Sequence, residues 1–149
     1  MSLEEEALCV MSKDNDGNPA VPVSWLWDAI RAGCSRVTAG GKQTSFIKFQ
    51  SVIHLPPGSI PLQGKNGSVP EWEVYKSVQH RAVRSKRLVL VLAPLFRDWS
   101  LRLDIILESS SADEELVRQV LLEAGKAGIG LFHPPKKHFG QFKILGKVR

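Results

Sequence analysis

The feature that most constrains the fold is a helical pattern in the last third of the chain. Ser111 and Glu114 have the spacing of a capping box, in which the two side chains bond to backbone N–H groups at the start of a helix. The apolar residues that follow recur every three or four positions: Leu116, Val117, Val120, Leu121 and Ala124. Because this spacing puts them on one face, the sequence predicts an amphipathic helix over 111–124 that ends at Gly125.

Apolar segments before this helix predict strands. Residues 88–92 are continuously apolar, as a strand covered on both faces would be, so we expect a strand over 87–92. Apolar and polar residues alternate over 101–107, which is typical of a strand with one buried face, and 94–99 would form the turn between the two. A looser alternation after Pro70 predicts a further strand.

The N-terminal part predicts one strand and one helix. A short apolar run over 7–12, closed by a dense turn signal at 13–18, predicts a first strand. A helix with one buried face is expected to start at Pro22 or Ser24 and to end at Gly33.

The middle and the end of the chain complete the order of elements. The apolar positions within 35–70 fit a short helix and a strand equally well, and proline favours an edge or a loop at 60–67. Residues 139–145 predict a final strand. This order is that of a ferredoxin-like α+β sandwich, an antiparallel sheet with two helices on one face, here with extra segments in the middle. At 149 residues the chain is predicted to form a single domain, 1–149.

The charge and the cysteines indicate where such a chain works. A net charge of +5 at pH 7 favours polyanionic partners. Cys9 and Cys34 could form one disulfide, but the first residues are acidic where a secretory signal would be basic and then apolar, so we expect a cytoplasmic protein. The longest apolar run, 88–93, is far shorter than the roughly 20 residues that span a bilayer, so no membrane partner is expected.

The common motifs of nucleotide, metal and thiol chemistry are missing from the sequence. Residues 40–44 resemble a phosphate-binding loop, but Arg36 and Gln43 stand where that motif needs glycine and serine or threonine. His133 and His138 have no cysteine near them in sequence, as a zinc site would require. No serine lies in a nucleophile elbow, and a cysteine with scattered histidines is no signature of a thiol enzyme. We predict no cofactor, no metal and no catalytic residue.

The basic residues form two groups without acidic neighbours. One group precedes the strand at 87–92 and the other occupies the end of the chain, whereas acidic residues concentrate at 4–16 and 113–123. If the groups meet in the fold, they form one positive surface suited to phosphates; the alternative is a solvated face and a frayed basic tail. The first group comprises Arg81, Arg84, Lys86 and Arg87, and the second comprises Lys136, Lys137, Lys143, Lys147 and Arg149.

A long glycine-rich segment, residues 125–144 (GKAGIGLFHPPKKHFGQFKI), follows the C-terminal helix. Its pattern of Gly128, Gly130, a basic insert and Gly140 before a strand resembles the C-terminal glycine-rich loop of the repeat-associated (RAMP) proteins of CRISPR systems. The resemblance implies a ferredoxin-like RNA binder. Glycine lets backbone N–H groups approach a phosphate closely. The alternative is a helix cap followed by a β-bulge.

The chain also resembles small phage-encoded proteins. The shared motifs are an early Pro-x-Ser-Trp helix, a Glu-Trp-Glu strand, an Arg-Asp-Trp turn and a Gly-x-Gly-x-Phe ending. This resemblance implies a phage context. Because some RAMP proteins cleave RNA with a histidine, His54, His80, His133 and His138 are the candidates for a metal-independent endoribonuclease.

The predicted function is non-catalytic binding of single-stranded RNA or DNA, with Trp99, Phe132 and Phe139 as candidate stacking residues. The binding residues that we predict are Gly128, Gly130, Lys136, Lys137, His138, Gly140, Lys143, Arg81, Arg84, Lys86 and Arg87.

The main alternative is a protein-interaction module, a phage factor that binds or imitates a RAMP-like subunit of a protein complex. Exposed Trp25, Trp27 or Trp72 would mark its interface, because aromatic residues are enriched at such surfaces.

Overall fold

The structure is a computed structural model, and its description covers most of the chain. The described residues are 2–39, 41–65, 68, 70–81, 87–108, 114–130 and 140–145, with the backbone alone for 39, 77–81 and 87–91. The chain forms two compact units, each built from two segments: Met1–Val21 with Ser59–Arg102, and Pro22–Gly58 with Leu103–Arg149. That both units belong to one domain over 1–149 stays a prediction.

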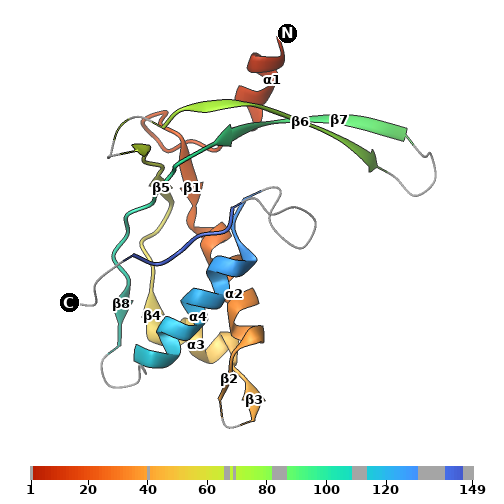
Figure 1. The fold of residues 1–149 in the computed structure, drawn as a ribbon. Coiled ribbons are helices and arrows are strands. Elements are labelled where there is room, and N and C mark those ends of the chain that lie inside the picture. The colour runs from red at the N-terminus through yellow and green to blue at the C-terminus, as the bar shows by residue number, and fades with distance from the viewer. Residues whose placement is uncertain are drawn as a thin grey trace. The chain divides into compact units, whose positions relative to one another are not determined.

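A long antiparallel hairpin dominates the first unit (Figure 1). Strands β6 (Trp72–Arg81) and β7 (Arg87–Phe96) pair along their whole length. This confirms the strands predicted after Pro70 and over 87–92. The predicted turn at 94–99 is wrong in its first half, because Pro94 still pairs with Val74 inside the ladder. Proline is tolerated there because the outer edge of a two-stranded ladder needs no backbone donor.

The N-terminal element of the first unit is a helix, α1 (Leu3–Val10), so the strand predicted over 7–12 is wrong. Ser2 and Glu5 form a capping box, and three acidic residues occupy the first turn. Both features stabilise a helix N-terminus, and they outweigh the short apolar run. Helix α1 packs against β6 and β7, with Ala7 fully buried.

A turn and a short ladder complete the first unit. The predicted turn at 13–18 is confirmed, because the Asp14 Oδ1 atom accepts hydrogen bonds from the N–H groups of Asp16 and Asn18. Strand β1 (Ala20–Pro22) then pairs with β5 (Ser59–Pro61). Residues 60–67, predicted as an edge or a loop, therefore begin as the end of a short strand.

Two packed helices organise the second unit, α2 (Val23–Arg36) and α4 (Glu114–Ala127). Both helices were predicted, and each continues beyond its predicted end. Gly33 lies within α2 where α4 crosses it, and a Cβ atom on Gly33 would lie 2.5 Å from the Val120 carbonyl oxygen. The residue predicted to end the first helix instead allows the two backbones to approach.

The region from residue 35 to residue 70 contains several short elements. Strands β2 (Thr38–Ala39) and β3 (Lys42–Gln43) form a small hairpin, and α3 (Phe46–Val52) follows. The chain then enters β4 (Ile53–His54), which pairs with β8 (Ile106–Leu107). The two patterns that fitted 35–70 equally well are thus both present, one after the other.

Two predicted strands near the C-terminus differ from the structure. Burial alternates along 101–108 as predicted, but only Ile106 and Leu107 join a ladder. Residues 140–145 form no strand, so the predicted final strand is wrong over these residues, and Phe139 lies outside the described range. The backbone of 140–142 bonds to the end of a helix instead, as detailed below.

The fold class is α+β, with helices and small antiparallel ladders. A ferredoxin-like fold needs four strands in one sheet, and the described strands pair two at a time, so this finer prediction is not confirmed. Over the described ranges no helix is long and apolar enough to cross a bilayer.

Candidate nucleic-acid interface

The glycine-rich segment starts as the C-terminal cap of α4. Gly128 has a left-handed backbone with φ of +79°, and its N–H donates to the Ala124 carbonyl at 2.9 Å. This is the αL motif that ends many helices, which glycine forms without strain from a side chain. The helix-cap interpretation of the segment therefore holds at Gly128.

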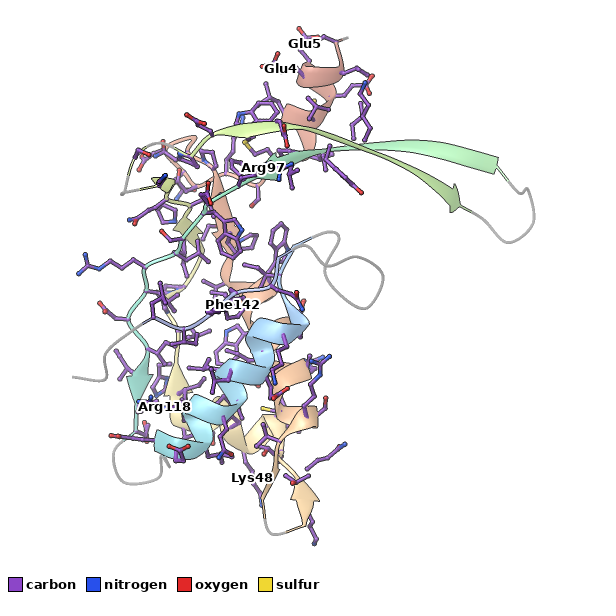
Figure 2. The ribbon with its side chains drawn as sticks, viewed as in Figure 1. Glu4, Glu5, Lys48, Arg97, Arg118 and Phe142 are labelled. Carbon is purple, nitrogen blue, oxygen red and sulfur yellow. The ribbon has the colours of Figure 1, made fainter. Side chains whose placement is uncertain are left out.

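Residues 140–142 satisfy the remaining carbonyl groups at this helix end. The Phe142 N–H donates to the Gly125 carbonyl at 3.0 Å, and the Gln141 side-chain amide donates to the Lys126 carbonyl at 2.9 Å. The last carbonyls of a helix have no partner within the helix, so these bonds fix the returning chain against α4. Figure 2 shows Phe142 beside this end of the helix.

The two sides of the segment meet so closely that only glycine fits. The Ile129 N–H donates to the Gly140 carbonyl at 3.0 Å, which joins the chain on either side of 131–139. A Cβ atom on Gly140 would overlap the Ile129 carbonyl oxygen, and one on Gly125 would overlap that of Phe142. Gly140 also has a φ of +80°. Gly128 and Gly140 therefore close the base of the segment.

Gly130 differs from the other predicted binding glycines. Its φ is +102°, yet a Cβ atom added there would meet no heavy atom within 4 Å. Packing therefore gives no reason for glycine at this position, and only the positive φ favours it. Lys136, Lys137 and His138 lie outside the described residues, as do Phe132 and Phe139.

The side chains that flank the base differ in charge pairing. Lys143 is exposed. The Lys126 ammonium pairs with the Glu123 carboxylate at 2.8 Å. Lys143 is therefore the better placed of the two to meet an anionic ligand.

The first basic group lies at one end of the long hairpin. Arg81 and Arg87 are the last residue pair of the β6–β7 ladder. Arg84 and Lys86 belong to 82–86, which lies outside the described residues. At the other end of the ladder, Arg97 pairs with Glu73 at 2.7 Å. The sequence therefore places basic residues at one end of the hairpin and acidic Glu71 and Glu73 at the other.

The two predicted basic groups belong to different compact units. Arg81 and Arg87 lie in the first unit, and the glycine-rich segment lies in the second. The prediction that they form one positive surface stays a prediction.

Of the four histidines that are candidates for catalysis, the structure describes the side chain of His54 alone. The His54 Nε2 atom lies 3.4 Å from the Glu108 carboxylate, and both side chains are about half exposed. The backbone of His80 lies in β6, while His133 and His138 are outside the described range. Over the part of the chain that is described, no three His, Cys, Asp or Glu residues gather as a metal site would need.

The cysteine thiols are both free. Cys34 is buried in α2, and this burial raises its pKa from 9.0 to about 11. Because the thiolate is the nucleophilic form, Cys34 is inert at neutral pH. Cys9 is exposed on α1.

One basic surface escaped the sequence-based prediction. Between Asp28 and Glu71 the sequence has no acidic residue, although it has Arg31, Arg36, Lys42 and Lys48. The sequence signal that could have revealed these basic residues as a group is the absence of acidic residues. Most of that stretch falls within 35–70, where the sequence pattern did not distinguish a helix from a strand.

Comparison with known proteins adds no family: no family model matches the chain, and no match was found among curated proteins or solved structures. The resemblances to RAMP proteins and to phage-encoded proteins therefore stay predictions.

Proposed function

We propose that this chain is a non-catalytic module that binds single-stranded RNA or DNA through its phosphate backbone. The observation that supports this most is the closed base of the glycine-rich segment, where Ile129 bonds to Gly140. The sequence between these residues carries Lys136, Lys137 and His138 without an acidic residue. A stretch anchored at both ends to a helix terminus loses less conformational entropy on binding than a free basic tail.

Gly130 gives this binding mode a backbone component. Its φ is positive, and no heavy atom lies within 4 Å of the place a Cβ atom would take. Backbone N–H groups near glycines of this conformation can bind anions, and they add to what charged side chains contribute. The lysines would supply charge that does not depend on base sequence.

The hairpin supplies a second basic group. The pairing of Arg81 with Arg87 brings both ends of 82–86 together, and residues 81–87 carry four basic residues and no acidic one. Basic side chains gathered at one hairpin end can neutralise neighbouring phosphates of a single strand, so this end is a suitable contact.

The setting that we propose is the cytoplasm, in a phage context, where both thiols stay reduced. Binding of this kind does not require a ferredoxin-like sheet, which stays a prediction. A protein-interaction module remains the alternative, although Trp25, Trp27 and Trp72 are half-buried rather than exposed. An endoribonuclease is the third possibility.

The test compares two double variants with the same change in charge. Lys136→Ala/Lys137→Ala removes two lysines from the segment, and Lys13→Ala/Lys65→Ala removes two exposed lysines from the other unit. We expect the first pair to weaken binding of unrelated single strands equally and to flatten the salt slope by about 1.4, which is roughly 0.7 for each lost phosphate contact. The second pair should bind like the wild type.

Equal affinities and salt slopes for the two double variants would show that the segment is only a helix cap. Capture of a protein partner that survives nuclease treatment, without affinity for oligonucleotides, would favour the interaction module. Shortening of a labelled RNA in the presence of a chelator would instead indicate the endoribonuclease.

A further inference from the structure

Exposed basic side chains lie on the two helices that carry an aromatic pair in the second unit, away from the glycine-rich segment in sequence. Its members are Arg31 and Arg36 on α2, Phe46 and Lys48 on α3, and Trp27 on α2. We call this the Phe46 surface. None of the residues belongs to the proposed interface above.

An arginine side chain lies over one ring of the aromatic pair. The Trp27 and Phe46 rings meet edge to face, with centroids 6.1 Å apart. The Arg31 guanidinium carbon lies 4.8 Å from the centroid of the Phe46 ring. Arg31 is exposed, so its planar group rests on the ring and still faces solvent. Guanidinium planes and aromatic rings are the surfaces on which proteins stack unpaired bases.

The small hairpin brings the backbone of a second arginine near the start of α3. The Thr44 N–H and hydroxyl group both donate to the Val37 carbonyl at 2.9 Å. This antiparallel pairing puts Arg36, the residue before Val37, opposite Ser45, the residue before Phe46. Lys48 is the third residue of α3, two positions after Phe46, and the burial of Phe49 anchors that helix.

The positive charge of this surface is uncompensated. Asp28 is the only acidic residue in the sequence from residue 22 to residue 58, against four basic ones. The four basic side chains are exposed, and no carboxylate of a described residue lies within 4 Å of them. Exposed cations on the same elements as an arginine that lies over a ring favour a ligand that combines phosphates with flat unpaired bases.

We propose that the Phe46 surface is a binding site for single-stranded nucleic acid. A base stacks on the Arg31 guanidinium that rests on Phe46, and Arg36 and Lys48 contact the flanking phosphates. This site needs neither the glycine-rich segment nor the basic end of the long hairpin, so it can exist where those contacts do not.

The stacking part is tested with a charge-conserving variant, Arg31→Lys, because lysine keeps the charge but cannot stack as a plane. We expect it to weaken binding of a labelled single strand by at least about fivefold, the lower end of what one stacked base contributes. The same variant should bind an abasic strand of the same length as tightly as the wild type does. Phe46→Leu, which keeps an apolar side chain against Trp27, should show the same contrast.

The phosphate part is tested with Arg36→Ala/Lys48→Ala against the Lys13→Ala/Lys65→Ala control. The first double variant should lose affinity for both the normal and the abasic strand, with a salt slope flatter by about 1.4. Thermal midpoints near the wild-type value would confirm that these exposed substitutions leave the fold intact.

Photocrosslinking locates the site independently of any variant. Trypsin cleaves after Lys42 and Lys48, so a bromouridine strand bound at the Phe46 surface should mark the peptide 43–48. Absence of this crosslink, or control-like behaviour of the Arg36/Lys48 pair, would overturn the proposal. Displacement of the strand by polyglutamate as readily as by the abasic strand would also overturn it, in favour of an acidic protein. Loss of binding only in the Lys136/Lys137 variant would refute this site and leave the proposed function standing.

Discussion

At the scale of single residues, the structure divides the glycines of the C-terminal segment into two kinds. Gly128 and Gly140 have positive φ and face backbone atoms of the opposing chain, so any side chain would disturb the helix cap. Gly130 has positive φ and open space. Glycines of the first kind serve the fold, and Gly130 is the one that we propose contacts a ligand.

This division predicts different costs for the same substitution. Gly140→Ala should lower the free energy of unfolding by roughly 2–4 kcal/mol, because it adds an overlap with the Ile129 carbonyl to the strain of a positive φ. Gly130→Ala should cost only about 1–2 kcal/mol, from backbone strain alone. Urea unfolding followed by circular dichroism measures both values. Equal costs would show that the base of the segment is looser than described.

Cys34 predicts a pH dependence of stability. Burial raises its pKa in the folded chain from 9.0 to about 11, so between these values the unfolded chain has released a proton that the folded chain keeps. Stability from this group is therefore complete below pH 9 and is lost as the pH rises toward 11, by up to about 1.4 kcal/mol per pH unit. The stability difference between the wild type and Cys34→Ala should shrink over this range. A constant difference would contradict the burial of the thiol.

At the scale of elements, the sequence predicted the features that depend on one repeating pattern. The buried face of α4 and the existence of strand β7 were predicted correctly, because each depends on a pattern in consecutive residues. The ends of the helices were predicted too early. Gly33 and Gly125 lie close to distant backbone and do not end their helices. The strand predicted at 7–12 failed because a capping box outweighed five apolar residues.

The candidate site shows the same limit. The glycine positions in the C-terminal segment were recognised from the sequence. Their hydrogen-bond partners could not be predicted, because Gly125 bonds to Phe142, which lies far along the chain. The Phe46 surface was missed because Arg31 and Phe46 are 15 residues apart and meet only through the packing of α2 and α3. Only the absence of acidic residues between them was visible.

The crossing of α2 and α4 gives a test at this scale. Gly33→Ala would bring a Cβ atom to 2.5 Å from the Val120 carbonyl oxygen, so we expect a net loss of about 1–2 kcal/mol in spite of alanine's better helix propensity. Ser35→Ala, at an exposed position of the same helix, should change stability by less than about 0.5 kcal/mol. A Gly33→Ala variant more stable than the wild type would contradict the close approach of the helices.

At the scale of the whole molecule, charge is unevenly distributed along the chain. Acidic residues are absent from 29–70 and from 124–149, and these stretches hold eleven of the 20 lysine and arginine residues, in addition to the hairpin group. Each basic region borders an ordered feature: a helix cap, the end of a hairpin or an arginine stacked on a ring. Several separate phosphate contacts are therefore expected when the chain binds a nucleic acid.

The most direct test is the affinity of the wild-type chain for labelled single strands of unrelated sequence, measured by anisotropy between about 50 and 200 mM salt. We predict measurable binding at the lowest salt concentration, similar affinities for all sequences, and a linear fall of the logarithm of the binding constant with the logarithm of salt concentration. No binding at the lowest salt concentration, or binding that salt does not weaken, would contradict a backbone-binding function.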